Sequence, residues 1–397
     1  VAFTSAAGGR RYKKSKWKTA SFGIGINRVA DFSNNYIYSG PNNTSSASEV
    51  FLADIIANPG DFDNNNYFSG LGYNSYLLHY INDTIGYTQV PNFTTGLNQS
   101  RSVQERGGIT DVNISFGGNY EEKLMLGATI GIPSIRYLRD VTLREEDASG
   151  NPDNDFNYFE YKESLKTTGT GINLKLGFIY NFTKYFRAGA AIHTPTYYGL
   201  TDVQSRFVVS HTEGFKAYLG DDPNPVTRVD APLNEYQYSL ITPWRGVISM
   251  ATIIGKYGFI SADYEYVDYS SARYYFEDID SYYESEVNNG IKTMYKGGHN
   301  LRIGGEARFD MLMVRLGFGY YGNPYKNEAM GSARMNYSAG VGARFDNFFI
   351  DLGFNHSTSS FKEKPYAIVY PNEVIDVPSA NVKSSFNNVA LTFGVKF

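Results

Sequence analysis

The chain has 397 residues, with 34 Tyr, 27 Phe and 40 Gly, but charged residues make up only 19% of it. This composition favours strands and turns over helices. The absence of cysteine excludes a disulfide framework and a thiolate metal site, and the net charge of -4 argues against a nucleic-acid-binding surface, which needs an excess of basic residues.

No stretch of the sequence is apolar enough for a membrane-spanning helix. The longest apolar stretch, residues 246–255, is well below the roughly 18 to 20 residues that span the hydrocarbon core of a bilayer. The mean hydropathy of -0.36 is typical of a soluble protein. Such an average does not detect a membrane barrel, however, because its strands alternate apolar and polar residues. Periodicity therefore has to decide between the two classes.

Apolar residues recur at every second position in many segments, which predicts strands. A clear example begins at residue 123, and others begin near residues 171, 311, 333 and 383. Glycine and charged residues share the opposite face in most of these runs. The apolar face is expected to contact lipid through Leu126, Ile130, Leu174, Leu316, Phe318, Val341 and Leu391.

Strand length, aromatic placement and loop length distinguish a membrane barrel from a soluble sandwich, in which the apolar face would pack against a core. Many runs alternate over about 9 to 11 residues, the length that a tilted strand needs to cross a bilayer. Aromatic residues such as Trp17, Tyr180 and Trp244 lie at strand ends, as in interfacial girdles. Short turns alternate with five long polar connections, predicted to lie outside the cell: residues 31–102, 140–164, 200–234, 269–299 and 357–381.

The fold predicted from these patterns is all-β, a transmembrane antiparallel β-barrel in the bacterial outer membrane. Thirteen strands can be counted, and residues 1–397 are assigned to one barrel domain. Bacterial single-chain barrels normally have an even number of strands. The loop rhythm makes residues 1–6 a strand that runs inward, so an outward strand has to precede it. We therefore expect about 14 strands, with the first strand and an N-terminal plug missing from the sequence shown.

A short helix is predicted within the first long connection. Residues 46–49 resemble a capping box, and Pro59 ends the apolar stripe that follows. The helix either packs against its own loop over the barrel mouth or serves as a binding site for an apolar ligand. The candidate ligand-binding residues are Phe51, Leu52, Ile55 and Ile56.

Three prolines interrupt strand patterns and are candidates for a distortion of the barrel wall: Pro133, Pro195 and Pro243. Proline removes one donor from a strand ladder. Beyond Pro133 the apolar residues switch from even to odd positions, which predicts a bulge or bend. The alternatives are that the prolines mark the outer rim of their strands, or that they create a side exit into lipid.

Catalytic, metal-binding and cofactor-binding motifs are not found, so the chain is predicted not to be an enzyme and to need no metal or cofactor. The adjacent pair His356 and Ser357 lies at a predicted strand end, where an ordinary interfacial histidine is expected. Charged residues on the polar strand faces either hold a filled interior together or guide carboxylates inward. They are Lys175, Arg187, Asp263, Glu265, Arg302, Glu306, Arg308, Arg315, Arg334, Arg344 and Asp351.

Four segments, residues 107–133, 168–198, 242–274 and 387–397, resemble the FadL/TodX-type transporters found in Bacteroidetes, and the similarity extends over nearly the whole chain. The resemblance implies a fourteen-stranded outer-membrane barrel, an N-terminal plug with an Asn-Pro-Ala motif, passive uptake of long-chain fatty acids or other hydrophobic compounds, and lateral release. The Asn-Pro-Ala motif is absent from this sequence, and Asn58-Pro59-Gly60 does not replace it. The gating residues of the family therefore have no counterpart to which they can be assigned.

Two functions remain open at this stage. The first is passive outer-membrane transport of hydrophobic compounds such as long-chain fatty acids. The alternative is a non-transporting barrel within a multiprotein outer-membrane assembly, for example of type IX secretion, because related barrels serve such systems. The expected partners are hydrophobic small molecules, outer-membrane lipid or detergent, and other outer-membrane proteins, but not nucleic acid.

Overall fold

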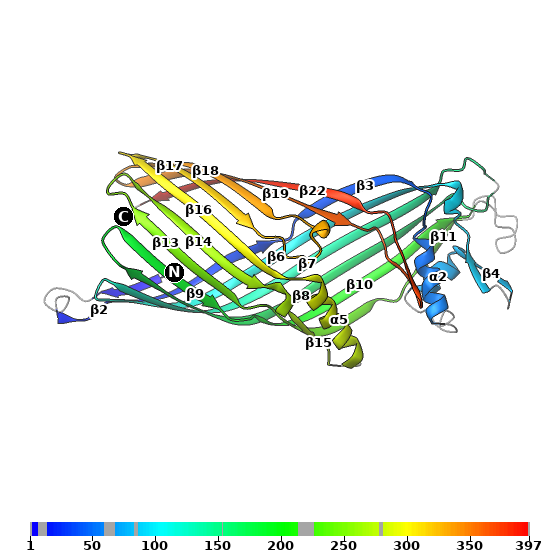
Figure 1. The fold of residues 1–397 in the computed structure, drawn as a ribbon, viewed down its shortest axis with the longest axis horizontal. Coiled ribbons are helices and arrows are strands. Elements are labelled where there is room, and N and C mark those ends of the chain that lie inside the picture. The colour runs from blue at the N-terminus through cyan, green and yellow to red at the C-terminus, as the bar shows by residue number, and fades with distance from the viewer. Residues whose placement is uncertain are drawn as a thin grey trace.

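The computed structural model describes residues 2–6, 14–58, 68–82, 86–152, 154–212, 226–277 and 281–395. Most of them form one large antiparallel sheet, which Figure 1 shows curled into an elongated tube. Within these ranges no helix combines the length and apolarity needed to span a membrane. The all-β antiparallel fold predicted from the sequence is confirmed. Pro59, which was predicted to end the first helix, lies outside the described residues.

The first part of the sheet contains its longest strands. It begins with β1 (Ala2–Ala6), β2 (Trp17–Asp31) and β3 (Asn34–Asn42), followed by β6 (Leu97–Tyr120), β7 (Leu124–Asp147) and β8 (Tyr158–Asn181). Strand β2 pairs with β1 on one side and with β6 on the other, and β3 extends the pairing along β6. The order then continues through β7 to β8.

The second part contains strands that are interrupted along their length. Strands β9 (Phe186–His193) and β10 (Tyr197–His211) both pair with β8. Strands β12 (Asn234–Ile241) and β13 (Arg245–Ile253) continue this arrangement, β12 against β10 and β13 against β9. Strand β14 (Gly258–Asp268) then pairs with β13, while the short β15 (Arg273–Tyr275) pairs with β12. Strand β11 (Val226–Asp230) adds to the far end of β10.

The third part is a regular meander of shorter strands. It runs from β14 through β16 (Gly297–Phe309), β17 (Leu312–Tyr321), β18 (Arg334–Arg344) and β19 (Phe348–Glu363) to β22 (Ala380–Val395). Strands β6, β7 and β8 have 24 residues each, whereas β16, β17 and β18 have 13, 10 and 11. The wall of the tube therefore differs in height around its circumference (Figure 1).

The alternation predicted from the sequence is present on the two faces of the sheet. The predicted lipid-facing residues are exposed on the outer face, from Leu174 at 37% to Leu391 at 72%. Most of the predicted interior charges are joined in pairs. Arg315 contacts Glu306 at 2.7 Å and Asp351 at 2.8 Å, and Arg344 also contacts Asp351. These contacts favour the interpretation in which the interior charges hold the wall together.

Several loop boundaries predicted from the sequence are wrong, because the strands extend further than the alternation indicates. Residues 34–42 and 97–102 are strand, and so are residues 140–147 and 158–164. In the connection 200–234, residues up to His211 belong to β10. Beyond the predicted membrane the outer face of a strand meets water, so its residues need not be apolar and the period-two signal disappears.

The long connections other than residues 269–299 pack together at the end of the tube opposite the short turns (Figure 1). Helices α2 (Ser48–Ala57) and α3 (Ser69–Asn74) and the hairpin of β4 (Leu78–Asn82) and β5 (Gly86–Gln89) lie there. Together with the extensions of β6, β7, β8 and β10 they form one core, which includes Phe51, Ile55, Leu71, Leu97, Leu143, Phe159 and Val208. The opposite side of α2 packs through Ala53 against a second hairpin, β20 (Ile368–Tyr370) and β21 (Glu373–Ile375).

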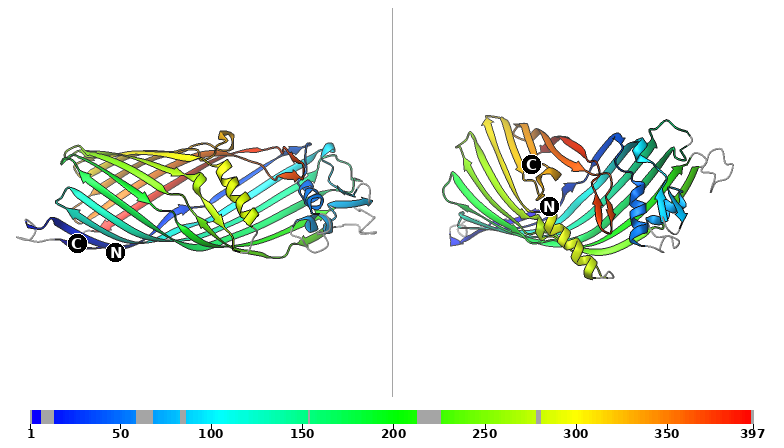
Figure 2. Two further views of the ribbon diagram at one scale, coloured as in Figure 1. Left: turned by 60° about the horizontal axis from the view of Figure 1, so that its bottom comes forward. Right: turned by 45° about the vertical axis from the view of Figure 1, so that its right-hand side comes forward.

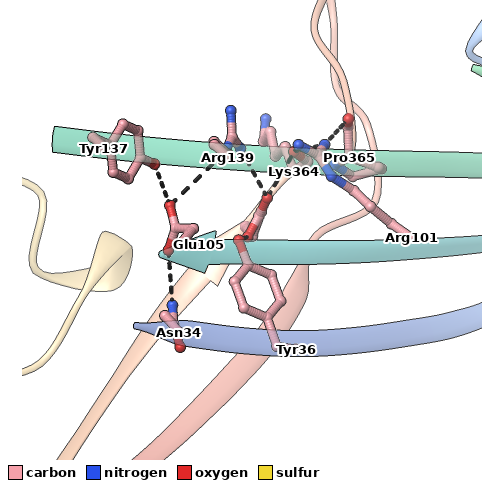
Figure 3. A network of polar contacts seen from close by, with 9 residues as sticks. Asn34, Tyr36, Arg101, Glu105, Tyr137, Arg139, Lys364 and Pro365 are labelled. Carbon is pink, nitrogen blue, oxygen red and sulfur yellow. Dashed lines mark hydrogen bonds and ion pairs between the residues drawn. The ribbon is translucent and has the colours of Figure 1, made fainter. Parts of the chain in front are cut away.

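The two edges of the curled sheet meet through side chains. Among the described residues, no ladder joins β22 to β1 or to β3. Arg101 of β6 is 9% exposed and contacts Glu363 at the end of β19 at 3.3 Å. The hydroxyl of Tyr36 on β3 donates to the same carboxylate, and the Arg101 guanidinium also donates to the carbonyl of Pro365 (Figure 3). We call this contact between Arg101, Tyr36 and Glu363 the seam.

Candidate functional site

Three neighbouring strands are interrupted at the same height of the wall. Residues 194–196 separate β9 from β10, and residues 242–244 separate β12 from β13. On the next strand, the 3-10 helix η3 (Tyr269–Ser271) separates β14 from β15. Because β10 and β12 pair with each other and β13 pairs with both β9 and β14, the interruptions lie side by side. We call them the break band.

Proline and threonine determine the local structure of the break band. Pro195 and Pro243 lack the N–H that a ladder needs. Threonine hydroxyls supply part of the missing pairing: Thr194 Oγ1 accepts from Leu174 N at 3.0 Å, and Thr242 Oγ1 accepts from Thr196 N at 2.8 Å. At each point one backbone bond remains, from Thr194 N to Leu174 O at 2.9 Å and from Thr242 N to Thr196 O at 3.1 Å, so a side-chain bond replaces only part of the ladder.

Pro133 contributes to the same band in a different way. The bulge predicted at Pro133 is wrong, because β7 pairs with β6 without a register shift from Gly131 to Ser134. The even-to-odd change of the apolar residues arises because the interior face of β7 becomes apolar beyond Pro133, where Val141 is buried and Leu143 belongs to the loop core. On its other side, however, the ladder between β7 and β8 omits Ile132 and Pro133. The three prolines thus mark one weakened line across the wall.

Glycines on β8 allow the neighbouring strand to resume close to it. A Cβ on Gly171 would lie 2.7 Å from Tyr197 O and 2.8 Å from Thr196 Cγ2. At Gly169 a Cβ would lie 2.1 Å from Gly199 O. A backbone contact of this kind cannot yield by a rotamer change, so β10 could not begin in this position beside any other residue.

The break band lies some way along the wall from the short turns, at a level where the outer face carries exposed aromatic residues. Strand β9 has 8 residues, and a rise of about 3.3 Å with a tilt of roughly 40° places the band about 20 Å from the short turns. Aromatic residues surround it on the outer face, with Tyr197 at 61% and Trp244 at 54% exposure. Such residues are typical of the boundary between hydrocarbon and water.

The interior face of the wall is polar at the break band. Lys175 forms an ion pair with the buried Asp111, and its Nζ also donates to Asn113 Oδ1 at 3.1 Å. Asn173 Nδ2 donates to Thr196 Oγ1 at 3.0 Å. Further around the wall, Glu265 accepts from Asn300 at 2.8 Å and lies 3.6 and 3.7 Å from Arg302 and Arg245. The cations at this level therefore already have carboxylate partners.

The interior face becomes apolar and aromatic on the long-loop side of the band. Tyr198 and Leu200 are 7% and 5% exposed. The ring of Tyr238 contacts those of Tyr274 and Phe276, with centroids 5.5 and 6.0 Å apart. These residues stand on β10, β12 and the segment around β15, the same strands that are interrupted just below. The sequence prediction missed this surface, because Leu200, Tyr274 and Phe276 lie in segments that were assigned to loops, although Tyr198 and Tyr238 do not.

Helix α5 (Ser281–Met294) covers the free edge that the interruption leaves on β15. The side chain of Asn288 accepts from Tyr274 N and donates to Tyr274 O, both at 2.8 Å. A single asparagine thus replaces the neighbouring strand. Figure 2 shows α5 beside the shorter half of the wall. The sequence analysis did not predict this helix, because only a narrow set of its residues, Glu284, Val287, Asn288 and Ile291, is even partly buried.

The four candidate residues of α2 differ in accessibility. Phe51 and Ile55 are 2% and 3% exposed and belong to the loop core. Leu52 is partly buried against the same core, and Ile56 is 48% exposed. A ligand that approaches α2 would therefore meet Ile56 and the edge of Leu52 before the other two. Ligand binding at α2 stays a prediction.

The N-terminus of α2 is anchored by a buried carboxylate from β7. Glu145 accepts from Ser46 Oγ, Ala47 N and Gln99 Nε2, each at 2.6 Å, and is fully buried. Burial raises the pKa of this carboxyl from 4.5 to about 7, although the three donors oppose the shift. Tyr366, from the last long connection, donates to or accepts from Ser45 and accepts from Gln99. One polar cluster therefore joins α2, β6, β7 and that connection.

The sequence matches no family model and no curated protein. Solved structures similar to this chain include a Pseudomonas aeruginosa FadL homologue, with 14% identity, a TM-score of 0.48 and coverage of 75% of this chain and 74% of that one. The Pseudomonas putida toluene transporter TodX is 12% identical, with a TM-score of 0.45 and coverage of 95% and 82%. The CymD monoaromatic hydrocarbon channel is 10% identical, with a TM-score of 0.41 and coverage of 94% and 88%. FadL-type and TodX-type channels are thus the structural neighbours that the sequence resemblance predicts.

Proposed function

We propose that this chain is a passive outer-membrane channel for hydrophobic compounds, which leave its interior through the break band. The observation that carries the proposal is the alignment of three strand interruptions on adjacent strands. Elsewhere around the tube, the ladders run on with few register shifts. Lateral passage through a wall requires neighbouring strands to separate, and this occurs at least cost where the ladder is already interrupted and side-chain bonds replace part of it.

The apolar interior surface next to the band is an argument for an apolar substrate. Tyr198, Leu200 and Tyr238 line the wall immediately on the long-loop side of the break. A hydrophobic molecule that enters the mouth has a lower free energy against this surface than in water. The aromatic residues outside the wall, Tyr197 and Trp244, lie beside the same break.

Long-chain fatty acids belong to the proposed class together with uncharged hydrocarbons. The carboxylate of a fatty acid would need a cation at the level of the band, and Lys175 and Arg245 are the nearest candidates. Both contact protein carboxylates, Asp111 and Glu265. A fatty acid would have to displace one of these pairs, whereas an uncharged compound would not, so the two substrates are separable in a transport assay.

A reversible cross-link across the band tests the proposal. The chain contains no cysteine, so an engineered pair reacts alone. Thr196→Cys with Thr242→Cys would join the two interruptions. The control pair, Ala190→Cys with Ile248→Cys, would join β9 to β13, where the ladder is intact. Uptake of radiolabelled toluene and oleate into proteoliposomes is the measurement.

Oxidation of the Thr196/Thr242 pair should slow uptake severalfold, and reduction should restore it, while the Ala190/Ile248 pair should transport equally in both states. Equal uptake before and after oxidation of the Thr196/Thr242 pair would contradict a side exit at the band. If the unmodified protein transports neither compound faster than empty liposomes, the alternative of a non-transporting assembly component is favoured.

A further inference from the structure

An apolar groove runs across the outer face of the wall near the short turns. Its volume is about 680 Å³, and its lining comes from β2, β6, β7, β8 and β9. Small residues at Ala20, Gly118 and Ala190 leave space between larger ones on adjacent strands, such as Leu126 and Phe178. The ring of Trp17 lies against Gly118, where an added Cβ would be 2.6 Å from it, and forms the end of the groove.

The end of this groove carries a cluster of cations. Lys14 and Lys16 are exposed before β2, Lys123 is exposed between β6 and β7, and Lys184 is exposed between β8 and β9. Two exposed anions, Glu121 and Glu122, share the β6 to β7 turn. The balance at this end of the groove is therefore basic.

A second apolar groove of similar size lies on another part of the wall, and the charges beside it differ. It has a volume of about 590 Å³ and is lined from β14 to β19, with Gly305 and Ala339 between Leu316, Phe318 and Phe354. The short turns beside it carry Lys256 and Asp346, and Arg308 is followed by Asp310. Positive and negative residues balance there, so the second groove provides an internal control for the first.

We propose that the first groove holds an anionic glycerophospholipid of the membrane leaflet at the short turns, with one acyl chain between Leu126 and Phe178 and the headgroup phosphate near Lys16, Lys123 and Lys184. The proposal rests on the membrane-embedded barrel of the proposed function. An open apolar groove fits a single extended chain. Cations at the level of the headgroups, beside the interfacial ring of Trp17, select for negative charge.

Native mass spectrometry of the detergent-solubilised protein tests this proposal. The protein is mixed with phosphatidylglycerol or phosphatidylethanolamine of identical acyl chains, and the fraction that keeps a bound lipid is compared. The unmodified protein should retain phosphatidylglycerol in clear excess. Equal retention of the two lipids would overturn the selectivity.

Matched variants distinguish the contribution of the groove to lipid retention from that of the lysine charges. Ala190→Phe, which fills the first groove, should abolish the retained lipid, while Ala339→Phe in the second groove should leave it unchanged. Lys123→Ser with Lys184→Ser should make retention of the two lipids equal, and Lys256→Ser should not. Unchanged retention in Ala190→Phe would place the lipid elsewhere. Since this assay involves no transport, its failure is distinguishable from failure of the proposed channel function.

Discussion

Thr196 and Thr242 hold the two proline interruptions together through a reciprocal pair of bonds. Thr242 N donates to Thr196 O at 3.1 Å, and Thr196 N donates to Thr242 Oγ1 at 2.8 Å. One of these bonds is made by a side chain, so the contact depends on residue identity in a way that an ordinary ladder does not. A single substitution can therefore remove half of this contact.

Removal of the Thr242 hydroxyl should weaken the band without altering the fold. Thr242→Val keeps the shape of the side chain but leaves Thr196 N without its acceptor. We expect a loss of about 1–2 kcal/mol in the free energy of unfolding, read as a lower temperature for the shift of the folded band on a semi-native gel. Thr242→Ser should recover most of the loss. A Val variant as stable as the unmodified protein would show that the bond contributes nothing.

Gly171 should tolerate no side chain, whereas Gly199 on the adjacent strand should. A Cβ on Gly171 would meet the backbone of Tyr197 at 2.7 Å, while nothing lies within 4 Å of a Cβ on Gly199. We expect Gly171→Val to cost roughly 1–3 kcal/mol through displacement of β10, and Gly199→Val to be close to neutral. Thermal unfolding of both variants, followed by circular dichroism, is the measurement. Similar losses in the two would contradict the close approach.

The anchoring of α2 should weaken as pH rises through about 7. Burial raises the pKa of Glu145 to about 7 from 4.5. The folded state therefore favours the protonated carboxyl, and this stabilisation is fully present below pH 4.5 and is lost as pH rises through 7, by up to about 3 kcal/mol. Glu49 has a pKa raised by burial in the same direction, and burial also raises that of Tyr366.

Hydrogen exchange of the α2 amides at pH 6 and pH 8, corrected for the intrinsic rate, measures this effect. Exchange should be faster at pH 8 in the unmodified protein. Glu145→Gln should show little difference between the two pH values, because the amide cannot ionise. The residual change in this variant reports on Glu49. A pH effect that is undiminished in Glu145→Gln would exclude Glu145 as its source.

The candidate ligand residues of α2 should separate into structural and accessible ones. Phe51→Ala removes a ring from the loop core and should cost about 3–5 kcal/mol of the stability of that core. Ile56→Ser changes an exposed side chain and should leave the loop folded. If apolar ligands first contact α2, Ile56→Ser should still reduce oleate uptake. Unchanged uptake would remove α2 from the path of the ligand.

The sequence predicts the membrane-facing part of this fold well because alternation there has one cause. The predicted lipid-facing residues from Leu126 to Leu391 are all exposed and apolar, so polarity there follows strand geometry residue by residue. Above that region the same strands contact water, loops and each other. Val141, Leu143 and Glu145 alternate on an interior face that meets a packed loop, and neither the length of β7 nor the role of Glu145 could be inferred.

The break band could be predicted only in part. Pro195 and Pro243 interrupt visible alternation, so the sequence identifies them as irregular. Their position side by side depends on the pairing of β9 with β13 and of β10 with β12, which is a relation between distant segments. The third interruption, at η3, contains no proline at all and arises where Asp268 accepts the N–H of Ser270. Nothing in the local pattern distinguishes that turn from an ordinary strand end.

The unequal height of the wall determines the direction from which the tube can be entered. Strands β6 to β8 extend far beyond the ends of β16 to β18, so the rim of the tube is oblique (Figure 1). The opening therefore faces sideways, toward the side with the shorter strands. For a barrel set in a membrane, that side lies close to the lipid surface. A molecule in the outer leaflet would thus reach the interior over the lower rim at β16 to β18, without first dissolving in the water above the longer strands.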